Sequence, residues 1–273
     1  GLGHAEEMLK NLKEMPSFQG AKVTVLHVVT PQSTAAVMTD KWEEGGKILA
    51  KAIQYLNLDP SQVSSILRQG DPKDVVCQVA DEMEADLIIM GSRGMKRLQS
   101  ILSNSVSQYV FQLSSRPMLL VKDDIYVKNI KRVMVAMDNS ESAKNSLNLA
   151  LFLLRGVVGG QLILANINTD LGGKLSGITD LQPERNSVLG MAMAEAERQS
   201  VAVRCVTSSG KPGEEICRLS KDLNIDLLLI GSPDRRPSIA KSFVDIDRLI
   251  GSSLSDYVRV NATSPVLLVR TIG

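Results

Sequence analysis

The sequence predicts an α/β protein built from two tandem, doubly wound domains with mainly parallel sheets. Three observations predict this class: a length of 273 residues, an internal repeat, and apolar strand-like runs that alternate with helix-like segments. Hydrophobic residues make up 44% of the chain but aromatic residues only 3%. The core is therefore expected to be aliphatic, which suits helices stacked on a buried parallel sheet.

The repeat has a constant spacing over its middle part. The segment from Gly70 to Ser92 recurs 140 positions later, from Gly210 to Ser232. The segment from Ser105 to Val121 recurs from Ser253 to Val269 at an offset of 148, so the second copy carries 148 − 140 = 8 extra residues between these segments. We therefore predict two copies of one domain, at residues 1–124 and 130–273.

Local periodicity predicts the elements of each copy. The first copy is expected to contain strands at Val23 to Val29, Val63 to Leu67, Leu87 to Met90 and Met118 to Val121, and helices at Trp42 to Leu56, Pro72 to Met83 and Ser105 to Leu113. The second is expected to contain strands at Val133 to Met137, Leu162 to Ile167, Val201 to Val206, Leu227 to Ile230 and Val266 to Val269, with helices from about Ser142, Pro183, Gly213 and Ser253.

The first copy shows one strand fewer than the five expected of each copy. Aligning Ala5 with Ala143 places the counterpart of the strand Val133 to Asp138 upstream of Gly1. In a doubly wound sheet that strand is central, so its removal leaves two interior edges unpaired. We expect that about ten native residues, the length of a strand and its turn, precede the sequence, or that another segment fills the central position.

Charge and composition exclude several function classes. The formal net charge is +1, which provides no field for gathering nucleic acid or an anionic membrane. Cys77, Cys205 and Cys217 form no CxxC pair, which favours a reducing cytoplasm. His4 and His27 have no partners at zinc-ligand spacing. There is neither an apolar run of membrane-spanning length nor a basic and apolar leader, so we expect no membrane insertion and no secretion.

A glycine-containing loop follows one strand of each copy and is the main candidate for chemistry. In the first copy the strand ends in Gly91-Ser92-Arg93-Gly94, and nine residues later Asn104-Ser105-Val106 opens a helix. Glycines at the carboxyl end of a strand let a ligand approach the backbone, and free amides at a helix start favour phosphate. Ligands of open α/β sheets bind beyond the strand carboxyl ends, where this loop lies. The spacing fits neither a P-loop nor a dinucleotide-binding fingerprint.

Both copies resemble the universal stress protein domain, and the chain resembles a tandem, UspA-like member of that family over nearly its whole length. The family's ATP-binding pattern is G-x2-G-x9-G-[ST]. The first copy matches it at Gly91, Gly94 and Ser105, with Asn104 in place of the third glycine. The resemblance implies an adenine nucleotide alpha hydrolase-like fold and binding of ATP or a related adenine nucleotide, with or without Mg²⁺.

The resemblance also implies roles for individual residues. Val28, Val29, Met90 and Gly91 would line the adenosine pocket, and Gly94, Ser105 and Val106 would hold the phosphates. Asn104 tolerates positive φ and so would keep the turn. Arg93, Lys96 and Arg97 are either solvated or in contact with phosphate, as are Arg235, Arg236 and Lys241 in the second copy.

The second copy carries a more altered loop. Gly231 is retained, but Asp234 replaces Gly94, Ser252 replaces the third glycine before Ser253, and Pro233 and Pro237 alter the insertion. A carboxylate facing a triphosphate is repulsive unless a metal intervenes. We therefore predict a degenerate second site. Its Asp138 is either the family's adenosine-facing aspartate or part of a helix capping box with Glu141.

The sequence leaves several functions open. The first hypothesis is a cytoplasmic nucleotide-binding stress or signalling protein, with its site in the first copy and no catalytic residues. The second is a nucleotide-independent scaffold, or a soluble regulatory domain of a larger protein such as a transporter. The third is slow ATP hydrolysis, for which the sequence offers no base. The family's final strands, here at Val121 and Val269, commonly pair domains, so self-association is expected either within the chain or as a homodimer.

Overall fold

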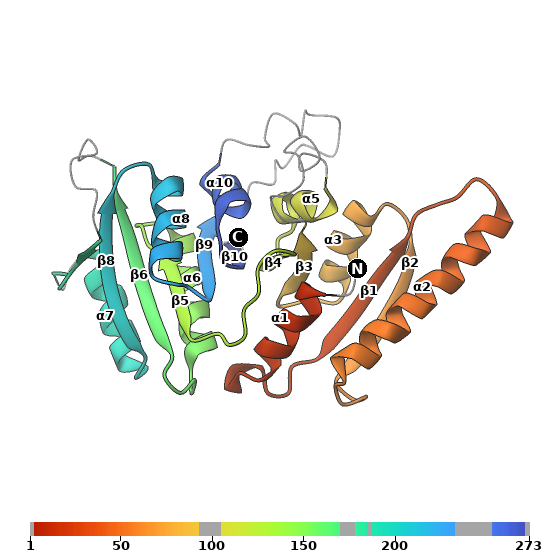
Figure 1. Ribbon diagram of the computed structural model, residues 1–273, viewed down its shortest axis with the longest axis horizontal. Helices are drawn as coiled ribbons and strands as arrows, with labels where there is room; N and C mark the ends of the chain where they lie inside the picture. The colour runs from red at the N-terminus through yellow and green to blue at the C-terminus, as the bar shows by residue number, and fades with distance from the viewer. Residues whose placement is uncertain (1–2, 93–104, 170–177, 185–186, 233–252, 271–273) are drawn as a thin grey trace.

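The computed structural model describes residues 3–92, 105–169, 178–184, 187–232 and 253–270, and every structural statement below refers to these residues (Figure 1). The strands form two sheets, one of two strands in the order β1-β2 and one of eight in the order β3-β4-β10-β9-β5-β6-β8-β7. The strands are β1 (Val23–Val29), β2 (Val63–Gln69), β3 (Ile88–Ser92), β4 (Met118–Lys122), β5 (Arg132–Ala136), β6 (Gln161–Asn168), β7 (Thr179–Asp180), β8 (Ala202–Ser209), β9 (Leu227–Ser232) and β10 (Val266–Arg270).

Helices cover these sheets. They are α1 (His4–Lys13), the short 3-10 helix η1 (Pro16–Phe18), α2 (Ala35–Leu56), α3 (Pro72–Glu82), α5 (Val106–Leu113), α6 (Glu141–Leu154), α7 (Val188–Arg198), α8 (Pro212–Asp222) and α10 (Leu254–Asn261). The alternation of strand and helix and the mainly parallel pairing confirm the predicted α/β class. None of the described helices is long and apolar enough to cross a membrane.

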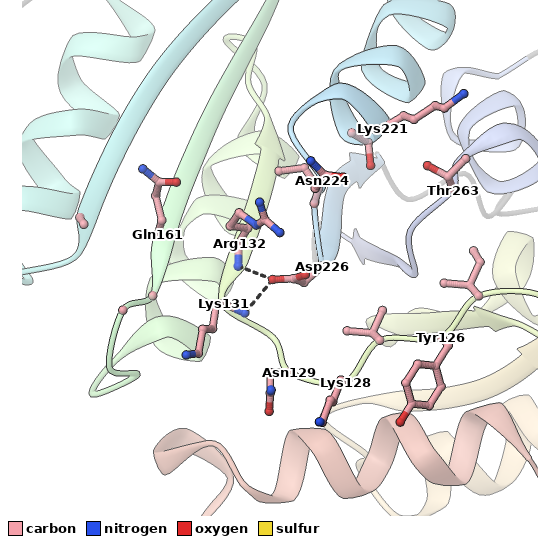
Figure 2. Close-up of a pocket in the computed structure, with 17 residues that line it drawn as sticks. Tyr126, Lys128, Asn129, Lys131, Arg132, Gln161, Lys221, Asn224, Asp226 and Thr263 are labelled. Atoms are coloured by element: carbon pink, nitrogen blue, oxygen red, sulfur yellow. Dashed lines mark hydrogen bonds between the residues drawn. The ribbon is translucent and has the colours of Figure 1, made fainter.

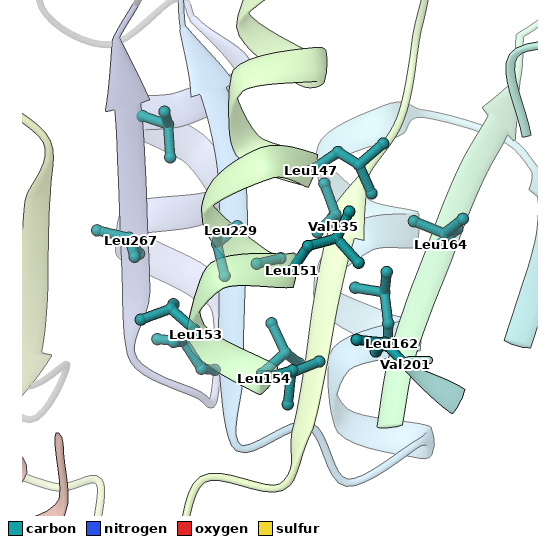
Figure 3. Close-up of a cluster of buried hydrophobic side chains, with 14 of the residues drawn as sticks. Val135, Leu147, Leu151, Leu153, Leu154, Leu162, Leu164, Val201, Leu229 and Leu267 are labelled. Carbon is teal, nitrogen blue, oxygen red and sulfur yellow. The ribbon is translucent and has the colours of Figure 1, made fainter. Parts of the chain in front are cut away.

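The second copy is a complete doubly wound sheet around β5. This strand pairs in parallel with β6 on one side and with β9 on the other. Its side chains alternate between two apolar clusters: Val133 and Val135 pack with α6, while Met134 packs in the cluster that contains Ile216 of α8 and Val258 of α10 (Figure 3). Each of these three β5 side chains has 0% exposure, as expected of a strand covered by helices on both faces.

No strand occupies the equivalent centre in the described residues of the first copy. Its four strands do not form one closed sheet, because β1 pairs only with β2 and β3 pairs only with β4 among the described residues. This arrangement agrees with the expectation of two interior edges. Helix α1, which the periodicity did not predict, packs over β3 and β4 and contributes Met8 and Leu12 to the same apolar cluster as α6.

The two copies are joined by their final strands. Strand β4 pairs with β10 in antiparallel orientation, and Leu119 lies opposite Leu267. These two leucines are themselves counterparts at the offset of 148, so the pairing is symmetric about them. The eight-stranded sheet is therefore continuous from one copy to the other.

Two helix starts differ from the sequence prediction because of capping side chains. Helix α2 begins at Ala35 instead of Trp42, since the Thr34 side chain accepts a hydrogen bond from the Val37 amide. Trp42 is consequently a mid-helix residue with 36% exposure, and not the first residue of its helix. Helix α7 begins at Val188, well after Pro183, because Ser187 caps it by accepting from the Gly190 amide at 3.0 Å.

Glycine is required at one matched pair of turns. Gly70 and Gly210 have φ values of +151° and +145°, each between a strand and the helix that follows it. Such φ values are strained for residues with a side chain. The repeat therefore preserves a backbone geometry as well as an apolar pattern.

The cysteines of the described residues form no disulfide. Cys77 and Cys217 lie at matched positions of α3 and α8 and pack against the same apolar cluster, as the sequence predicted. Burial raises the pKa of Cys217 to about 11. A thiol with such a pKa stays protonated at neutral pH, which fits a packing role.

Candidate functional site

The candidate site lies at the carboxyl ends of the parallel strands, where open α/β sheets bind ligands. In the first copy, β3 ends with Met90, Gly91 and Ser92, and α5 starts nearby after its N-cap residue Ser105. The Ser105 hydroxyl accepts a hydrogen bond from the Gln108 amide at 3.2 Å and lies 3.3 Å from the Ser107 hydroxyl. Besides the Gln108 amide, which the cap occupies, amides of the first helical turn lack a backbone partner within the helix and can bind an anion.

The structure brings only part of the predicted first-copy site together. Met90, Gly91, Ser105 and Val106 lie on adjoining elements, since α5 contacts β3. Val28 and Val29 end β1, which belongs to the separate two-stranded sheet. Arg93, Gly94 and Asn104 lie outside the described residues, as do Lys96 and Arg97. The described first-copy site is therefore a glycine, a helix start and the end of β3.

The second copy has its described site residues around one continuous sheet. Asp138 follows β5, Gly231 lies in β9, and Ser253 is the N-cap of α10. Asp234, Ser252 and the basic group Arg235, Arg236 and Lys241 lie outside the described residues, as do Pro233 and Pro237.

Asp138 has a local structural role that differs from the expected capping box. The N-cap of α6 is Ser140, whose hydroxyl accepts from the Ala143 amide at 3.2 Å. The Asp138 carboxylate accepts from the Ser140 amide at 2.9 Å and also from the Ser140 hydroxyl. Asp138 therefore forms a turn that orients the cap, while remaining exposed at the strand end.

Asn166 is a site residue that the sequence reasoning missed. Its side-chain amide donates to the Met137 carbonyl at 2.8 Å, directly before Asp138. The bond crosses from the end of β6 to the end of β5 and fixes the peptide that carries Asp138. His27 is the counterpart of Asn166 in the first copy. The carbonyls of Val29 and Asn168 are matched, because each accepts from the glycine amide of the matched turn. His27 and Asn166 lie two residues before them. The sequence signal for this position was that a polar residue, histidine or asparagine, occurs near the end of an apolar strand in both copies.

The matched glycines Gly91 and Gly231 differ in the space around them. A Cβ atom at Gly231 would lie 2.5 Å from the Ser142 carbonyl carbon and 2.8 Å from the Ala143 nitrogen. At Gly91 the nearest atom to such a Cβ is the Ala5 Cβ, at 3.8 Å. Gly231 is thus a close-packing glycine beneath the start of α6, whereas a Cβ at Gly91 would make only an ordinary van der Waals contact.

Ser253 takes part in a buried network of hydrogen bonds. Its hydroxyl donates to Asp256 at 2.9 Å, and Asp256 accepts from Gln112 of the first copy. Asp256 is 3% exposed and lies 3.6 Å from the Nε atom of Arg259, which is 5% exposed. Burial lowers the pKa of Arg259, and the Asp256 carboxylate opposes this shift. These charged residues lie between α5 and α10 and so connect the two copies.

A crevice of about 950 Å³ lies at the amino ends of β5, β6 and β8, away from the glycines of the second copy (Figure 2). Lys128, Lys131 and Arg132 line it, and its one acidic side chain, Asp226, accepts from the Lys131 and Arg132 amides at 3.0 and 2.7 Å. Figure 2 shows the Lys221 amine pointing out of the crevice. The crevice contains none of the predicted nucleotide residues, and no group of three metal-ligating side chains occurs in the described part of the chain.

Comparison with known proteins identifies the repeat unit. The family model described as "Universal stress protein family" matches residues 1–122 and 129–270. The chain is 31% identical to Universal stress protein YxiE of Bacillus subtilis over 120 residues, which cover 38% of this chain and 81% of that protein. It is 28% identical over 129 residues to a universal stress protein of Thermus aquaticus, covering 45% of this chain and 93% of that protein.

Solved structures match both copies together. One of them, a universal stress protein from Archaeoglobus fulgidus, has a TM-score of 0.74 and 23% identity, and the match covers 97% of this chain and 93% of that chain. At this identity the likeness concerns the fold.

Proposed function

Because the chain belongs to the universal stress protein family, we propose that it is a stress-response or signalling protein that binds ATP or a related adenine nucleotide in its first copy. The main observation in support of this proposal is that the matched glycines, Gly91 and Gly231, have different surroundings. Gly91 is exposed and a Cβ there would make an ordinary contact with Ala5, whereas a Cβ at Gly231 would meet the backbone of Ser142. Within the described part of the chain, the first copy therefore combines an exposed glycine at a strand end with a capped helix start.

The electrostatics of the first site favour an anion. Helix α5 directs its amino end toward the end of β3, and its Ser105 hydroxyl has no carboxylate partner among the described residues. In the second copy the Ser253 hydroxyl instead donates to the buried Asp256 carboxylate. A phosphate near Ser253 would meet that negative charge, and this supports one nucleotide per chain.

The proposed output is a difference between nucleotide-loaded and empty first copies, without turnover. Cys77, Cys205 and Cys217 form no disulfide, which supports a location in the reducing cytoplasm. An assembly role is compatible with the same fold, and the pairing of β4 with β10 is the observation that favours it. In that case the first site would stay empty in cells.

The test is a matched pair of serine variants. Isothermal titration of the purified chain with ATP, with and without Mg²⁺, and with AMP should give one site per chain. Ser105→Ala should weaken binding by about tenfold or more, because a hydrogen bond to a charged group contributes ~1.5–3 kcal/mol. Ser253→Ala removes an equivalent helix cap and should leave affinity unchanged.

Two results would count against the proposal. One is the absence of any titration signal together with no adenine compound in an acid extract of the protein. The other is a loss of affinity in Ser253→Ala but not in Ser105→Ala, which would move the site to the second copy. Replacing Gly94 with a bulky residue provides a further check, since the family pattern assigns it to phosphate contact.

A further inference from the structure

The crevice at the amino ends of β5, β6 and β8 carries a surplus of positive charge (Figure 2). Its cationic residues are Lys128 and Lys131 of the segment between the copies, Arg132 at the start of β5, and Lys221 near the end of α8. All four are exposed, and no ion pair or side-chain hydrogen bond engages them within the described part of the chain. Unpaired cations therefore gather here in a chain whose formal net charge is only +1.

One carboxylate, that of Asp226, lies among these cations, and it is directed at the backbone. Its Oδ2 atom accepts from the amides of Lys131 and Arg132 at 3.0 and 2.7 Å, and Figure 2 shows both bonds. The carboxylate therefore forms no ion pair with the cationic side chains of the described lining. That lining keeps a formal charge of 4 − 1 = +3, which attracts an anion from outside the chain.

Hydrogen bonds hold the crevice wall that the segment between the copies forms. The Asn11 side chain of α1 donates to the Val127 carbonyl, which ties this segment to the first copy. The Gln161 amide donates to the Lys131 carbonyl at 2.8 Å, which ties it to the second copy. A ligand would thus meet cations on an ordered backbone, and such preorganisation reduces the cost of binding.

The repeat shows that this charge is not a requirement of the fold. At the offset of 140, Lys221 and Asn224 correspond to Asp81 and Glu84 of the first copy. The backbone is alike, since φ is +50° at Asn224 and +48° at Glu84. In the first copy Asp81 is paired, because its Oδ1 atom lies 3.4 Å from the Nε atom of Arg116. The second copy therefore carries a cation and an amide where the first carries two carboxylates, which indicates a role beyond folding.

We propose that the crevice binds an acidic polypeptide segment of a partner protein. The cations are distributed from the segment between the copies to the end of α8. A ligand with several carboxylates along its length matches them better than a single phosphate group does. Tyr126, with 67% exposure, lines the same crevice and offers an apolar contact. The side-chain amides of Asn129 and Asn224 also line it and can donate to a peptide backbone.

The size and lining of the crevice also favour a peptide over a small molecule. The volume of about 950 Å³ is at the upper end of the ~300–1,000 Å³ range of small-molecule sites, and those sites are lined mostly by apolar side chains. Here ten of the 17 lining residues are charged or polar. The crevice is therefore closer in chemistry to a polar protein interface than to a cofactor pocket.

The test is fluorescence anisotropy of the full chain with a labelled peptide of about ten residues, glutamates with one central leucine, which is roughly 33 Å long when extended. We expect saturable binding that weakens as salt is raised, because salt screens exposed charges. Lys131→Gln with Arg132→Gln should weaken binding by about tenfold. Lys47→Gln with Lys51→Gln changes the net charge equally at exposed positions of α2 and should leave affinity unchanged. Equal thermal midpoints verify that both double variants fold.

Three results would overturn the assignment. The first is no binding of the peptide at low salt. The second is an equal loss of affinity in the two double variants, since the peptide would then respond to net charge alone. The third is tighter binding of inorganic tripolyphosphate than of the peptide, with loss of that binding in Lys131→Gln with Arg132→Gln. This result would assign the crevice to a small phosphorylated ligand.

Peptide binding and nucleotide binding are separable. The crevice contains Asp226, directly before β9, whereas the glycine of the repeat, Gly231, lies near the other end of that strand. Ser105→Ala should therefore leave peptide affinity unchanged, and Lys131→Gln with Arg132→Gln should leave ATP affinity unchanged. Loss of both activities in either variant would contradict two independent sites.

Discussion

Lys122 and Arg270 occupy matched positions of β4 and β10, and each caps the C-terminus of the last helix of the other copy. The Lys122 amine donates to the Val260 and Ala262 carbonyls at 2.7 and 2.6 Å, at the end of α10. The Arg270 guanidinium donates to the Phe111 and Gln112 carbonyls at the end of α5. Cations at helix C-termini satisfy free carbonyls and complement the helix dipole. The symmetric pairing of β4 and β10 is thus reinforced by reciprocal caps.

We expect Lys122→Met to lower the free energy of unfolding by about 1–3 kcal/mol, because two carbonyls lose a charged donor in a site where the lysine is only 5% exposed. Urea denaturation at pH 7 measures this. Lys128→Met, on the exposed linker, is the control and should change stability by less than about 0.5 kcal/mol. Equal stability of both variants would show that the cap contributes nothing.

The stability contribution of Lys122 should also depend on pH. Burial lowers the pKa of its amine from 10.5 to about 8. Below pH 8 both the folded and unfolded chains hold the proton, so the folded chain bears the cost of the buried charge. Between pH 8 and 10.5 the unfolded chain binds more protons, so stability rises with pH.

This dependence is measured as a difference between wild type and Lys122→Met. From pH 7 to pH 9.5, the wild type should gain about 1–3 kcal/mol relative to the variant. The comparison removes the contributions of other titrating groups that the two proteins share. Parallel pH profiles would mean that the Lys122 amine keeps its ordinary pKa.

Gly231→Ala should destabilise the protein far more than Gly91→Ala. The new Cβ at residue 231 would lie within 2.5–2.8 Å of backbone atoms of Ser142 and Ala143, and backbone cannot move aside as a flexible side chain can. Overpacking of this kind costs about 1–3 kcal/mol or more. At residue 91 the nearest atom is 3.8 Å away, so the change should stay within about 0.5 kcal/mol. Thermal denaturation of the two variants checks the difference, and similar midpoints would contradict it.

The buried pair Asp256 and Arg259 should show strong coupling. Asp256→Asn alone leaves the Arg259 charge buried without its partner and should cost about 3–5 kcal/mol. The double variant Asp256→Gln with Arg259→Phe installs the residues of the first copy, Gln108 and Phe111, at their counterparts. We expect it to lie within about 1.5 kcal/mol of wild type. A double variant less stable than the single one would show that the charges stabilise the contact between α5 and α10.

Most of the fold was predicted from local patterns of apolar and turn residues. Strand β1 spans Val23–Val29 as predicted, because an apolar run bounded by turn residues defines a buried strand. The repeat indicated the interior edges of the first copy. Helix α1 was missed because only Met8 and Leu12 are buried along its length. The start of α2 was missed because its first turns are exposed, so that capping by Thr34 decides the boundary.

The site was less predictable, because its decisive contacts join distant segments. The sequence showed that both copies retain a glycine after the strand, but not that α6 lies against Gly231. Likewise, the bond from Asn166 to the Met137 carbonyl depends on the register of β5 and β6. The nucleotide roles of Gly91 and Ser105 stay predictions that the titrations above will test.

The pairing of β4 with β10 also has a mechanical consequence. The copies are held together by more than the covalent linker, since ladder hydrogen bonds, shared apolar packing and the two reciprocal caps all cross the boundary. A chain cut in the linker near Asp124 would therefore remain one particle. The two halves would behave as a non-covalent heterodimer, able to find each other as separate polypeptides.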